Sequence, residues 1–399
     1  MSDLSCEVLV VGAGPAGSAA AAAVARTGRD VLLVESHQHP RPKACAEYAS
    51  PRIAEELQRL GLPDDAWQPD ALPVRGMRVI RGADAVEMTY HDAGGQRPAW
   101  GLDRERFDAA LAAHAVDNGA RLLERTALDD VHWRGGQDAT GGRVTGASLR
   151  TATGRLTVRC QWLIGADGAR SRTARSLNVD LGAGRPRRLG LVAHYEAVPE
   201  LADHGEMHVG SGYYIGLAPL ARNRLNVGMA LPMNGDRLGA EDRFAFAIQG
   251  IPAVAARLGG SRRLTPIRGA SPIGHRVRRS AGRGWMLIGD AAGFIDPFTG
   301  EGIYRALRSA RAAAEALGNG MDDGAAGRYR GARQRAFAAK DALTWTIQGM
   351  LAAPPVMSYA LRRLAARPQL AERLGSALGD LRPASDAISP AFLARVLWP

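Results

Sequence analysis

Residues 41–51, RPKACAEYASP, bring several reactive side chains together in a short stretch. Lys43 is one of only two lysines among the 51 basic residues of the chain, and Cys45 is one of three cysteines. A thiol can donate a proton, and an ammonium group can pair with a phosphate or with the carboxylate of Glu47. We therefore take Lys43 and Cys45 as candidate catalytic residues. The alternatives are a solvated loop lysine and a half-buried structural thiol.

A glycine-rich turn near the N-terminus predicts a nucleotide site. The apolar run EVLVVG is followed by glycines in G-x-G-x-x-G spacing, a helix of small residues and a second apolar run ending at Glu35. In this context the glycines allow a tight turn and close approach to a pyrophosphate, and the acidic residue accepts hydrogen bonds from a ribose. The helix N-terminus supplies amides to the phosphates. The predicted site contains Gly12, Gly14, Pro15, Ala16, Gly17, Glu35 and Ser36.

Two later apolar runs also end in an acidic turn. QWLIGADG reaches Asp167 and Gly168, and WMLIGD reaches Gly289 and Asp290, ahead of a helical segment that opens near Gly300. A carboxylate at the C-terminal end of a strand faces the ligand crevice of an open α/β sheet. Asp167 is alternatively a turn residue, and Asp290 is alternatively a helix cap.

These three stretches, in this order and at these spacings, resemble the glutathione-reductase-type FAD fold of class A (p-hydroxybenzoate hydroxylase-type) flavoprotein monooxygenases. They resemble still more the geranylgeranyl reductase-like FAD-dependent oxidoreductases that share this fold. The resemblance spans about residues 5–335. It implies an α/β protein with a Rossmann-like FAD-binding domain, an inserted antiparallel β-sheet substrate domain and C-terminal helices. It also implies FAD as the cofactor, with NAD(P)H as a transient reductant.

The resemblance assigns further roles. Arg104 leads a helix that approaches the FAD, Asp290 accepts hydrogen bonds from ribityl or ribose hydroxyls, and Pro297 forms a rigid turn against the isoalloxazine ring. The helix that begins near Gly300 directs its amides at the flavin N1/O2 edge, where reduced flavin carries negative charge. The implied cofactor-binding residues beyond the dinucleotide turn are Lys43, Ala44, Arg104, Asp167, Gly168, Gly289, Asp290, Pro297, Gly300, Glu301, Gly302 and Ile303.

The Lys-Ala-Cys triplet at 43–45 matches the start of the Lys-x-Cys-Gly-Gly motif of the reductases, but Ala46 and Glu47 replace the two glycines. Forms with Cys-Gly-Glu and a following Ser-Pro resemble flavoproteins associated with polyketide and phenolic-lipid hydroxylation. We therefore expect first an NAD(P)H-dependent monooxygenase that hydroxylates a hydrophobic small molecule. The alternative is a carbon–carbon double-bond reductase acting on an isoprenoid or lipid, and the second alternative is a flavin electron-transfer protein. The Trp-x-Trp-x-Ile-Pro signature of flavin halogenases is absent.

The domain organisation follows from the spacing of these matches. The FAD-binding domain is expected to be discontinuous, over 1–74, 100–180 and 275–335. Alternating runs in 75–99 and 181–274 predict antiparallel strands of the substrate domain, and 336–399 is expected to be helical. Tyr213 and Tyr214 fall in the substrate sheet, where they line the pocket or pack in its core; we take Tyr214 as the third candidate catalytic residue.

Other polar residues give weaker signals. Arg305, Arg308 and Arg311 share one helix face, which we interpret as a solvated face in preference to a site for a nicotinamide phosphate. His194, His204, His208 and His275 are scattered without metal-ligand spacing. No metal site is therefore predicted.

Composition limits the remaining possibilities. The chain of 399 residues has 46% hydrophobic and 23% charged residues, and we see no signal peptide, so we expect a cytoplasmic protein. Its net charge of +11 is spread along the chain without a nucleic-acid-binding motif, and no nucleic-acid partner is expected. The uncharged segment 342–361 contains two prolines, which argue against a spanning helix but leave peripheral membrane contact open. The sequence does not decide between a monomer and a homodimer.

Overall fold

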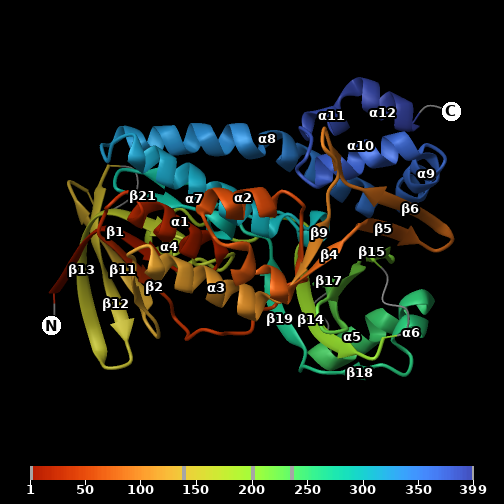
Figure 1. Ribbon diagram of the computed structural model, residues 1–399, viewed down its shortest axis with the longest axis horizontal. Helices are drawn as coiled ribbons and strands as arrows, with labels where there is room; N and C mark the ends of the chain where they lie inside the picture. The colour runs from red at the N-terminus through yellow and green to blue at the C-terminus, as the bar shows by residue number, and fades with distance from the viewer. Residues whose placement is uncertain (1–2, 137–140, 199–202, 234–237, 398–399) are drawn as a thin grey trace.

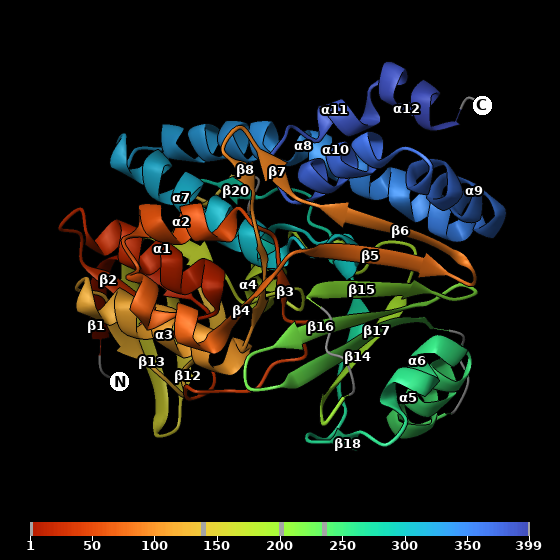
Figure 2. The ribbon, with the colours of Figure 1, turned by 45° about the vertical axis from the view of Figure 1, so that its right-hand side comes forward.

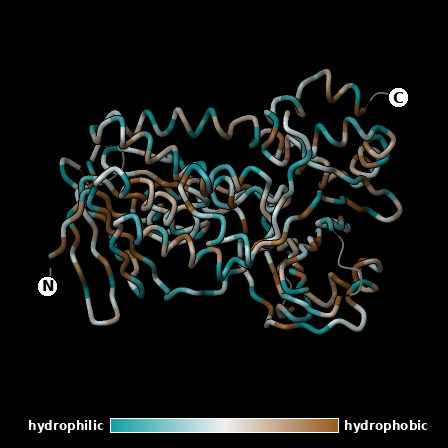
Figure 3. The backbone as a smooth tube through the Cα atoms, viewed as in Figure 1, coloured by the Kyte–Doolittle hydropathy of each residue, from teal (hydrophilic) through white to brown (hydrophobic). Residues whose placement is uncertain are grey.

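The computed structural model describes residues 3–136, 141–198, 203–233 and 238–397. Within these ranges the chain forms two large sheets, each covered by helices, with β1 (Asp3–Val11) and α12 (Pro390–Leu397) at opposite ends of the long axis (Figure 1). Hydrophobic residues recur along the strands of both sheets (Figure 3). This mixed α/β architecture confirms the predicted fold class.

The first sheet is built around β1, whose residues alternate between two hydrophobic clusters. Val8 and Val10 pack with α1 (Pro15–Ala25), α3 (Arg104–Asp117) and α7 (Gly302–Gly318), whereas Leu9 and Val11 belong to the cluster on the opposite face. β1 pairs in parallel with both of its neighbours, as expected for a Rossmann-like sheet. The order is β10-β2-β1-β13-β12-β11, with β21 beside β13 and β20 beside β21. The bounds are β2 Val31–Val34, β10 Arg121–Leu123, β11 Ala127–Arg134, β12 Arg143–Thr151, β13 Gly154–Gly165, β20 Ala281–Gly282 and β21 Trp285–Leu287.

The second sheet has the order β18-β14-β17-β16-β15-β5-β6, with β19 also paired to β14. Its pairs are antiparallel except for β15 and β5, which run parallel. The sheet is antiparallel as predicted except at this one pair, where two separate stretches of the chain, 75–99 and 181–274, meet. The bounds are β5 Gly76–Arg81, β6 Asp84–Thr89, β14 Arg188–Glu196, β15 His204–Val209, β16 Tyr214–Leu220, β17 Arg224–Pro232, β18 Arg262–Arg263 and β19 Arg268–Ile273.

Both faces of the second sheet are covered (Figure 2). α5 (Ala240–Gln249) and α6 (Pro252–Leu258) pack on the face that carries Ile215 and Val227, and the C-terminal helices pack on the face that carries Tyr214 and Ala230. The remaining elements are two small sheets and short helices. Their bounds are β3 Tyr48–Ala49, β4 Ala71–Val74, β7 His91–Asp92, β8 Gly95–Gln96, β9 Ala99–Leu102, α2 Ile53–Leu60 and α4 Arg172–Ser176.

The C-terminal segment is helical, as predicted. α8 (Gly324–Ala352) is a helix of 29 residues that leads from the first sheet towards the second (Figure 1). Pro354 and Pro355 occupy the first turn of α9 (Pro354–Ala365), where proline is tolerated. α10 (Pro368–Leu378), α11 (Ser385–Ile388) and α12 follow. Among the described helices, none combines the length and the apolar character needed to cross a membrane.

Candidate functional site

The glycine turn after β1 is shaped to receive a ligand. Gly12 has φ +101°, and a Cβ there would lie 2.7 Å from the Ala166 carbonyl oxygen, while a Cβ on Gly17 would collide with the Gly12 carbonyl. A Cβ on Gly14, by contrast, would meet only the Arg41 guanidinium, at 3.9 Å. The first turn of α1 has no side-chain cap, so its amides are available to phosphate oxygens. The turn therefore fits a dinucleotide pyrophosphate.

Glu35 lies beside this turn with its carboxylate fixed in place. The carboxylate accepts hydrogen bonds from the Ala13 amide (3.0 Å), from the Ser36 hydroxyl (3.0 Å) and from Arg41 Nη2 (3.1 Å). Burial by itself raises the pKa of Glu35. Arg41 and the surrounding amide and hydroxyl donors lower it by more, so the pKa falls to about 2. Glu35 is therefore ionised and suited to hold ribose hydroxyls. Arg41, which the sequence did not single out, belongs to the site.

The two acidic turns have different surroundings. Asp167 accepts hydrogen bonds from the Ser171 hydroxyl (2.6 Å) and the Thr173 amide (2.9 Å), so its carboxylate organises the start of α4, as in the turn alternative. Asp290 lies in the 3-10 helix η3 (Gly289–Ala292), which has no side-chain cap, so the cap alternative does not apply to it. A Cβ on Gly289 would lie 2.8 Å from Ala16, so this turn packs on the start of α1. Asp290 is thus half-buried beside the glycine turn.

The segment before α7 is tightly held. Asp296 caps the 3-10 helix η4 (Pro297–Thr299) by accepting the Phe298 amide at 3.0 Å. Gly300 has φ +67°, and a Cβ there would lie 2.9 Å from the Tyr48 ring, whereas a Cβ on Gly302 would meet nothing within 4 Å. The first residue of α7 therefore has open space beside it, as a helix N-terminus facing a flavin requires. Ile303, next along α7, is buried in the core below.

Glu301 faces away from that space. Its buried carboxylate lies 3.4 Å from Lys340 and 3.4 Å from Arg305, and Lys340 also pairs with Asp380 at 2.8 Å. Burial lowers the pKa of Lys340, but Asp380 and Glu301 raise it by more, so the ammonium stays charged. The second lysine of the chain thus ties the start of α7 to the C-terminal helices.

The arginine face of α7 corrects a prediction. Arg305 is buried, and its guanidinium lies 4.5 Å from the Phe337 ring centroid. Arg311 donates two hydrogen bonds of 2.8 Å to the buried Glu56 and one of 2.9 Å to Glu315. The interpretation of this face as solvated is therefore wrong, because α2 and α8 cover it and supply its carboxylate and aromatic partners.

The candidate catalytic residues occupy three distinct environments. Lys43 is exposed, and no ion pair joins it to another described residue; the alternative pairing with Glu47 is not formed, because Glu47 is held by other groups. Cys45 is half-buried, and its Sγ accepts hydrogen bonds from Arg104 Nη1 (3.0 Å) and from the Glu47 amide (3.4 Å). Arg104 is itself buried and paired with Asp108 at 2.8 Å. The structure therefore joins two predicted site residues, Cys45 and Arg104.

Tyr214 lies in the core between the second sheet and the C-terminal helices. Its hydroxyl donates to Asp296 at 2.5 Å, its ring packs edge-on against Phe298, and Arg188 lies over the ring and pairs with the same carboxylate. Burial raises the pKa of Tyr214 well above its ordinary value, and the adjacent Asp296 carboxylate raises it further. Tyr213 points to the opposite face, where its hydroxyl donates to the Ala247 carbonyl. Tyr214 thus packs in the core, and Tyr213 is half-buried against the cluster on the opposite face.

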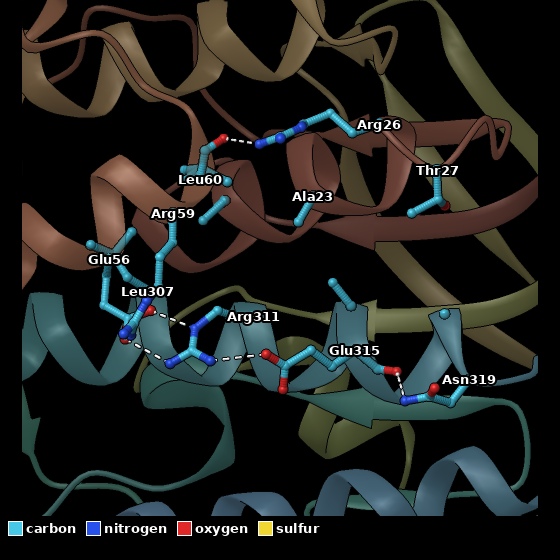
Figure 4. A pocket seen from close by; sticks show the side chains of 13 residues that line it. Ala23, Arg26, Thr27, Glu56, Arg59, Leu60, Leu307, Arg311, Glu315 and Asn319 are labelled. Carbon is cyan, nitrogen blue, oxygen red and sulfur yellow. Dashed lines mark hydrogen bonds and ion pairs between the residues drawn. The ribbon is translucent and has the colours of Figure 1, made fainter.

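A groove of about 530 Å³ lies elsewhere on the surface, between α1, α2 and α7 (Figure 4). Its apolar floor includes Ala23, Leu60 and Leu307, and the Arg311–Glu56 ion pair lies at one side. None of the predicted cofactor-binding residues lines it. The groove therefore does not belong to the site described above.

The sequence of this chain is similar to those of known proteins. The model of a family described as FAD binding domain matches residues 5–330. The chain belongs to this family. It is 33% identical over 325 residues to a menaquinone reductase of Mycolicibacterium smegmatis, covering 79% of this chain and 76% of the relative. It is 30% identical over 332 residues to a digeranylgeranylglycerophospholipid reductase of Methanothrix thermoacetophila, covering 81% and 80%.

The fold has a counterpart among solved structures. A geranylgeranyl bacteriochlorophyll reductase-like protein from Thermoplasma acidophilum superposes with a TM-score of 0.79 at 24% identity, over 98% of both chains. Together with the relatives above, this confirms the resemblance to geranylgeranyl reductase-like flavoproteins and identifies an FAD-dependent oxidoreductase. The glycine turn, Glu35 and the open start of α7 are the features of this chain that fit FAD.

Proposed function

We propose that this protein is an FAD-dependent reductase that saturates carbon–carbon double bonds in the isoprenoid chain of a lipid, with NAD(P)H as the reductant of the flavin. The observation that carries the proposal is the 33% identity to a menaquinone reductase across 79% of the chain. The similarity to a digeranylgeranylglycerophospholipid reductase supports it. This reverses the order in which the sequence ranks the reactions, because Ala46 and Glu47 taken alone favour hydroxylation.

When bound and reduced, FAD would supply a hydride to one carbon of the double bond. The protein must supply a proton to the other carbon, and Cys45 is the proposed donor. Arg104 Nη1 and the Glu47 amide both donate hydrogen bonds to the sulfur. They therefore stabilise the thiolate that remains when the proton leaves. Arg104 stays charged because Asp108 and Cys45 raise its pKa by more than burial lowers it.

Other residues hold the reacting groups in place. Glu35 and Asp290 would hold the hydroxyls of the cofactor, and the amides at the start of α7 would face the flavin edge that carries negative charge when the flavin is reduced. Tyr214 acts here as a support: its phenol is committed to Asp296, so it fixes the turn containing Pro297. The apolar side chains packed around Phe298 keep water from this side of the turn.

Contact with a membrane surface would give such a protein access to a lipid substrate. Trp345, in the last third of α8, and Val356, in the first turn of α9, are 47% and 44% exposed. Their segment, 342–361, carries no charged residue. An exposed tryptophan in an uncharged stretch suits the boundary between water and lipid. We propose this junction as the membrane-facing part of the protein.

The proposal is tested with purified FAD-loaded protein under anaerobic conditions. NADPH is added, and menaquinone or a geranylgeranyl-bearing phospholipid is supplied in detergent micelles. We expect the flavin to be reoxidised by the lipid. After the product has been exposed to air, which returns any quinol to the quinone, its mass should still exceed that of the substrate by two hydrogens, located in the isoprenoid chain. Reduced flavin that persists with every lipid, together with an oxygen-containing product after air is admitted, would overturn the proposal in favour of hydroxylation.

The role of Cys45 is tested in the same assay. Cys45→Ser is expected to lower the rate of lipid reduction at least about tenfold, because a serine hydroxyl is a weaker acid than a thiol. Flavin reduction by NADPH should be unaffected. Cys160→Ser, at a buried cysteine in the first sheet, is the matched control. Unchanged lipid reduction in Cys45→Ser would make this thiol structural.

A further inference from the structure

The carboxylate of Glu47 is buried, with only 5% of the residue exposed, and it accepts hydrogen bonds from three donors. The Arg104 amide donates to Oε1 at 3.1 Å, while His194 Nε2 (2.6 Å) and Asn226 Nδ2 (2.9 Å) donate to Oε2. With the Glu47 carboxylate as the acceptor, the proton of this contact lies on His194 Nε2. None of these three partners is a near neighbour of Glu47 in the sequence.

The three donors belong to different elements. Arg104 begins α3 on the first sheet, whereas His194 and Asn226 lie on β14 and β17 of the second sheet and face each other in register. Asn226 Nδ2 also donates to the Cys45 carbonyl at 2.9 Å. A Cβ on Gly228 would lie 3.2 Å from the Ala46 methyl group, so the loop rests directly on β17. Residues 45–47 are thus fastened to the second sheet.

The backbone at Glu47 has φ +57°, a left-handed conformation that a residue with a Cβ disfavours. Such a conformation persists where surrounding contacts determine it. Here the conformation directs the Glu47 amide at the Cys45 sulfur and leaves the Glu47 carbonyl to accept the Leu102 amide at 2.8 Å. The contacts of one side chain therefore fix the position of a neighbouring thiol.

We propose that Glu47, His194 and Asn226 form a latch that holds residues 45–47 on the second sheet and so positions the Cys45 sulfur. Glu47 is a positioning residue in this proposal, because it acts on the reaction through Cys45. The consequence for turnover rests on the proposed reductase function. The latch itself does not, and it is measured independently of any substrate.

The test is hydrogen–deuterium exchange of the full-length, FAD-loaded protein, followed in peptides that cover residues 43–49 and 99–104. His194→Ala removes a donor, and Glu47→Gln places an amide NH₂ against groups that are themselves donors. Both variants should speed exchange in these peptides at least about tenfold. His194→Gln keeps an N–H donor at the position of Nε2 and should exchange like the wild type.

The matched control is His208→Ala. His208 and Glu206 form a second glutamate–histidine pair, which is fully buried, at 2.7 Å within one strand of the same sheet. His208→Ala should leave exchange in both peptides unchanged, which separates loss of the latch from general loosening of the sheet. Wild-type exchange in both His194→Ala and Glu47→Gln would overturn the latch, as would exchange in His194→Gln as fast as in His194→Ala.

Turnover and its pH profile provide a second readout. The titratable groups that face the latch are Cys45, Arg104 and Asp108 together with Glu47 and His194. If His194 only positions the loop, His194→Gln keeps the wild-type pH profile of lipid reduction, whereas His194→Ala lowers kcat. An altered profile in His194→Gln would overturn the latch in favour of proton transfer by His194. If the wild type reduces no lipid, the reductase proposal fails while the exchange results still decide on the latch.

Discussion

Two glutamate–histidine pairs involve strands of the second sheet and serve different purposes. The contact is 2.6 Å in Glu47–His194 and 2.7 Å in Glu206–His208. The first joins residues 147 positions apart, from a loop and a strand, and the second joins two residues of β15. Glu206 is also held by Arg257 of α6 at 3.0 Å. The same chemical pair thus fixes a loop on the sheet in one place and stabilises a strand and its covering helix in the other.

The backbone records this difference. Glu47 adopts a left-handed conformation, whereas Glu206 lies in an ordinary strand. Contacts with residues distant in the sequence maintain the left-handed conformation at Glu47. The backbone at Glu206 is ordinary strand and needs no such contacts to keep its conformation. Of the two pairs, we therefore expect Glu47–His194 to affect the reaction, because it holds strained backbone beside the Cys45 thiol.

The largest difference in stability between the surroundings of the two pairs is expected when their arginines, Arg104 and Arg257, are replaced. Arg104→Met leaves the fully buried Asp108 without its partner and should cost about 3–5 kcal/mol of unfolding free energy. Arg257→Met should cost about 1 kcal/mol, because the Arg257 side chain is 29% exposed and Glu206 keeps His208. Urea unfolding of both variants measures this. Equal losses of unfolding free energy in the two variants would contradict the expectation that the buried Arg104–Asp108 pair contributes more to stability than the partly exposed Arg257.

Double-mutant cycles sharpen the comparison. The coupling energy between Glu47→Gln and His194→Ala should be about 1.5–3 kcal/mol, as for a hydrogen bond to a charged group. The corresponding cycle for Glu206→Gln and His208→Ala should give a smaller value, because Arg257 still pairs with Glu206 when His208 is removed. Unfolding free energies of the four single variants, the two double variants and the wild type supply both cycles. A larger coupling at the second pair would reverse the comparison.

Acid should reveal the stabilising pair at Glu206. Burial raises the pKa of Glu206, but His208 and Arg257 lower it by more, so its folded-state pKa lies below the unfolded value. The stability that ionised Glu206 contributes is therefore fully present above the unfolded pKa of about 4.3 and is lost as the pH falls through the folded pKa. The difference in unfolding free energy between wild type and Glu206→Gln should shrink from pH 7 to pH 3. A difference in unfolding free energy that stays constant from pH 7 to pH 3 would contradict a stabilising role for ionised Glu206.

The smallest expected effect changes sign between the two sites. Glu47→Gly should be more stable than Glu47→Ala by about 1 kcal/mol, since glycine adopts positive φ without steric cost. In β15 the order should reverse, with Glu206→Gly less stable than Glu206→Ala by about 0.5–1 kcal/mol. Thermal and urea unfolding of the four variants give both differences. The same sign at both sites would show that strain at Glu47 does not matter.

The sequence by itself determined the local parts of this protein. The strand, glycine turn and helix around Gly12, the acidic residue Glu35 and the start of α7 near Gly302 are each encoded within a few residues. Their geometry follows from turn sterics and from the change of a short segment from strand to helix, which that segment specifies on its own. These segments were also sufficient to predict the FAD-binding family and its fold.

The tertiary structure decided which side chains meet. In the sequence, His194 was one of several scattered histidines, and Arg305 belonged to a helix face interpreted as solvated. In the structure, His194 contacts Glu47 beside the candidate site, and Arg305 is buried in the core. Their partners depend on strand order and register: His194 and Asn226 reach Glu47 because β14 and β17 pair with these two residues opposite each other. A slip of one residue would turn His194 to the other face of the sheet. Register is a property of the assembled sheet, so no local pattern predicts it.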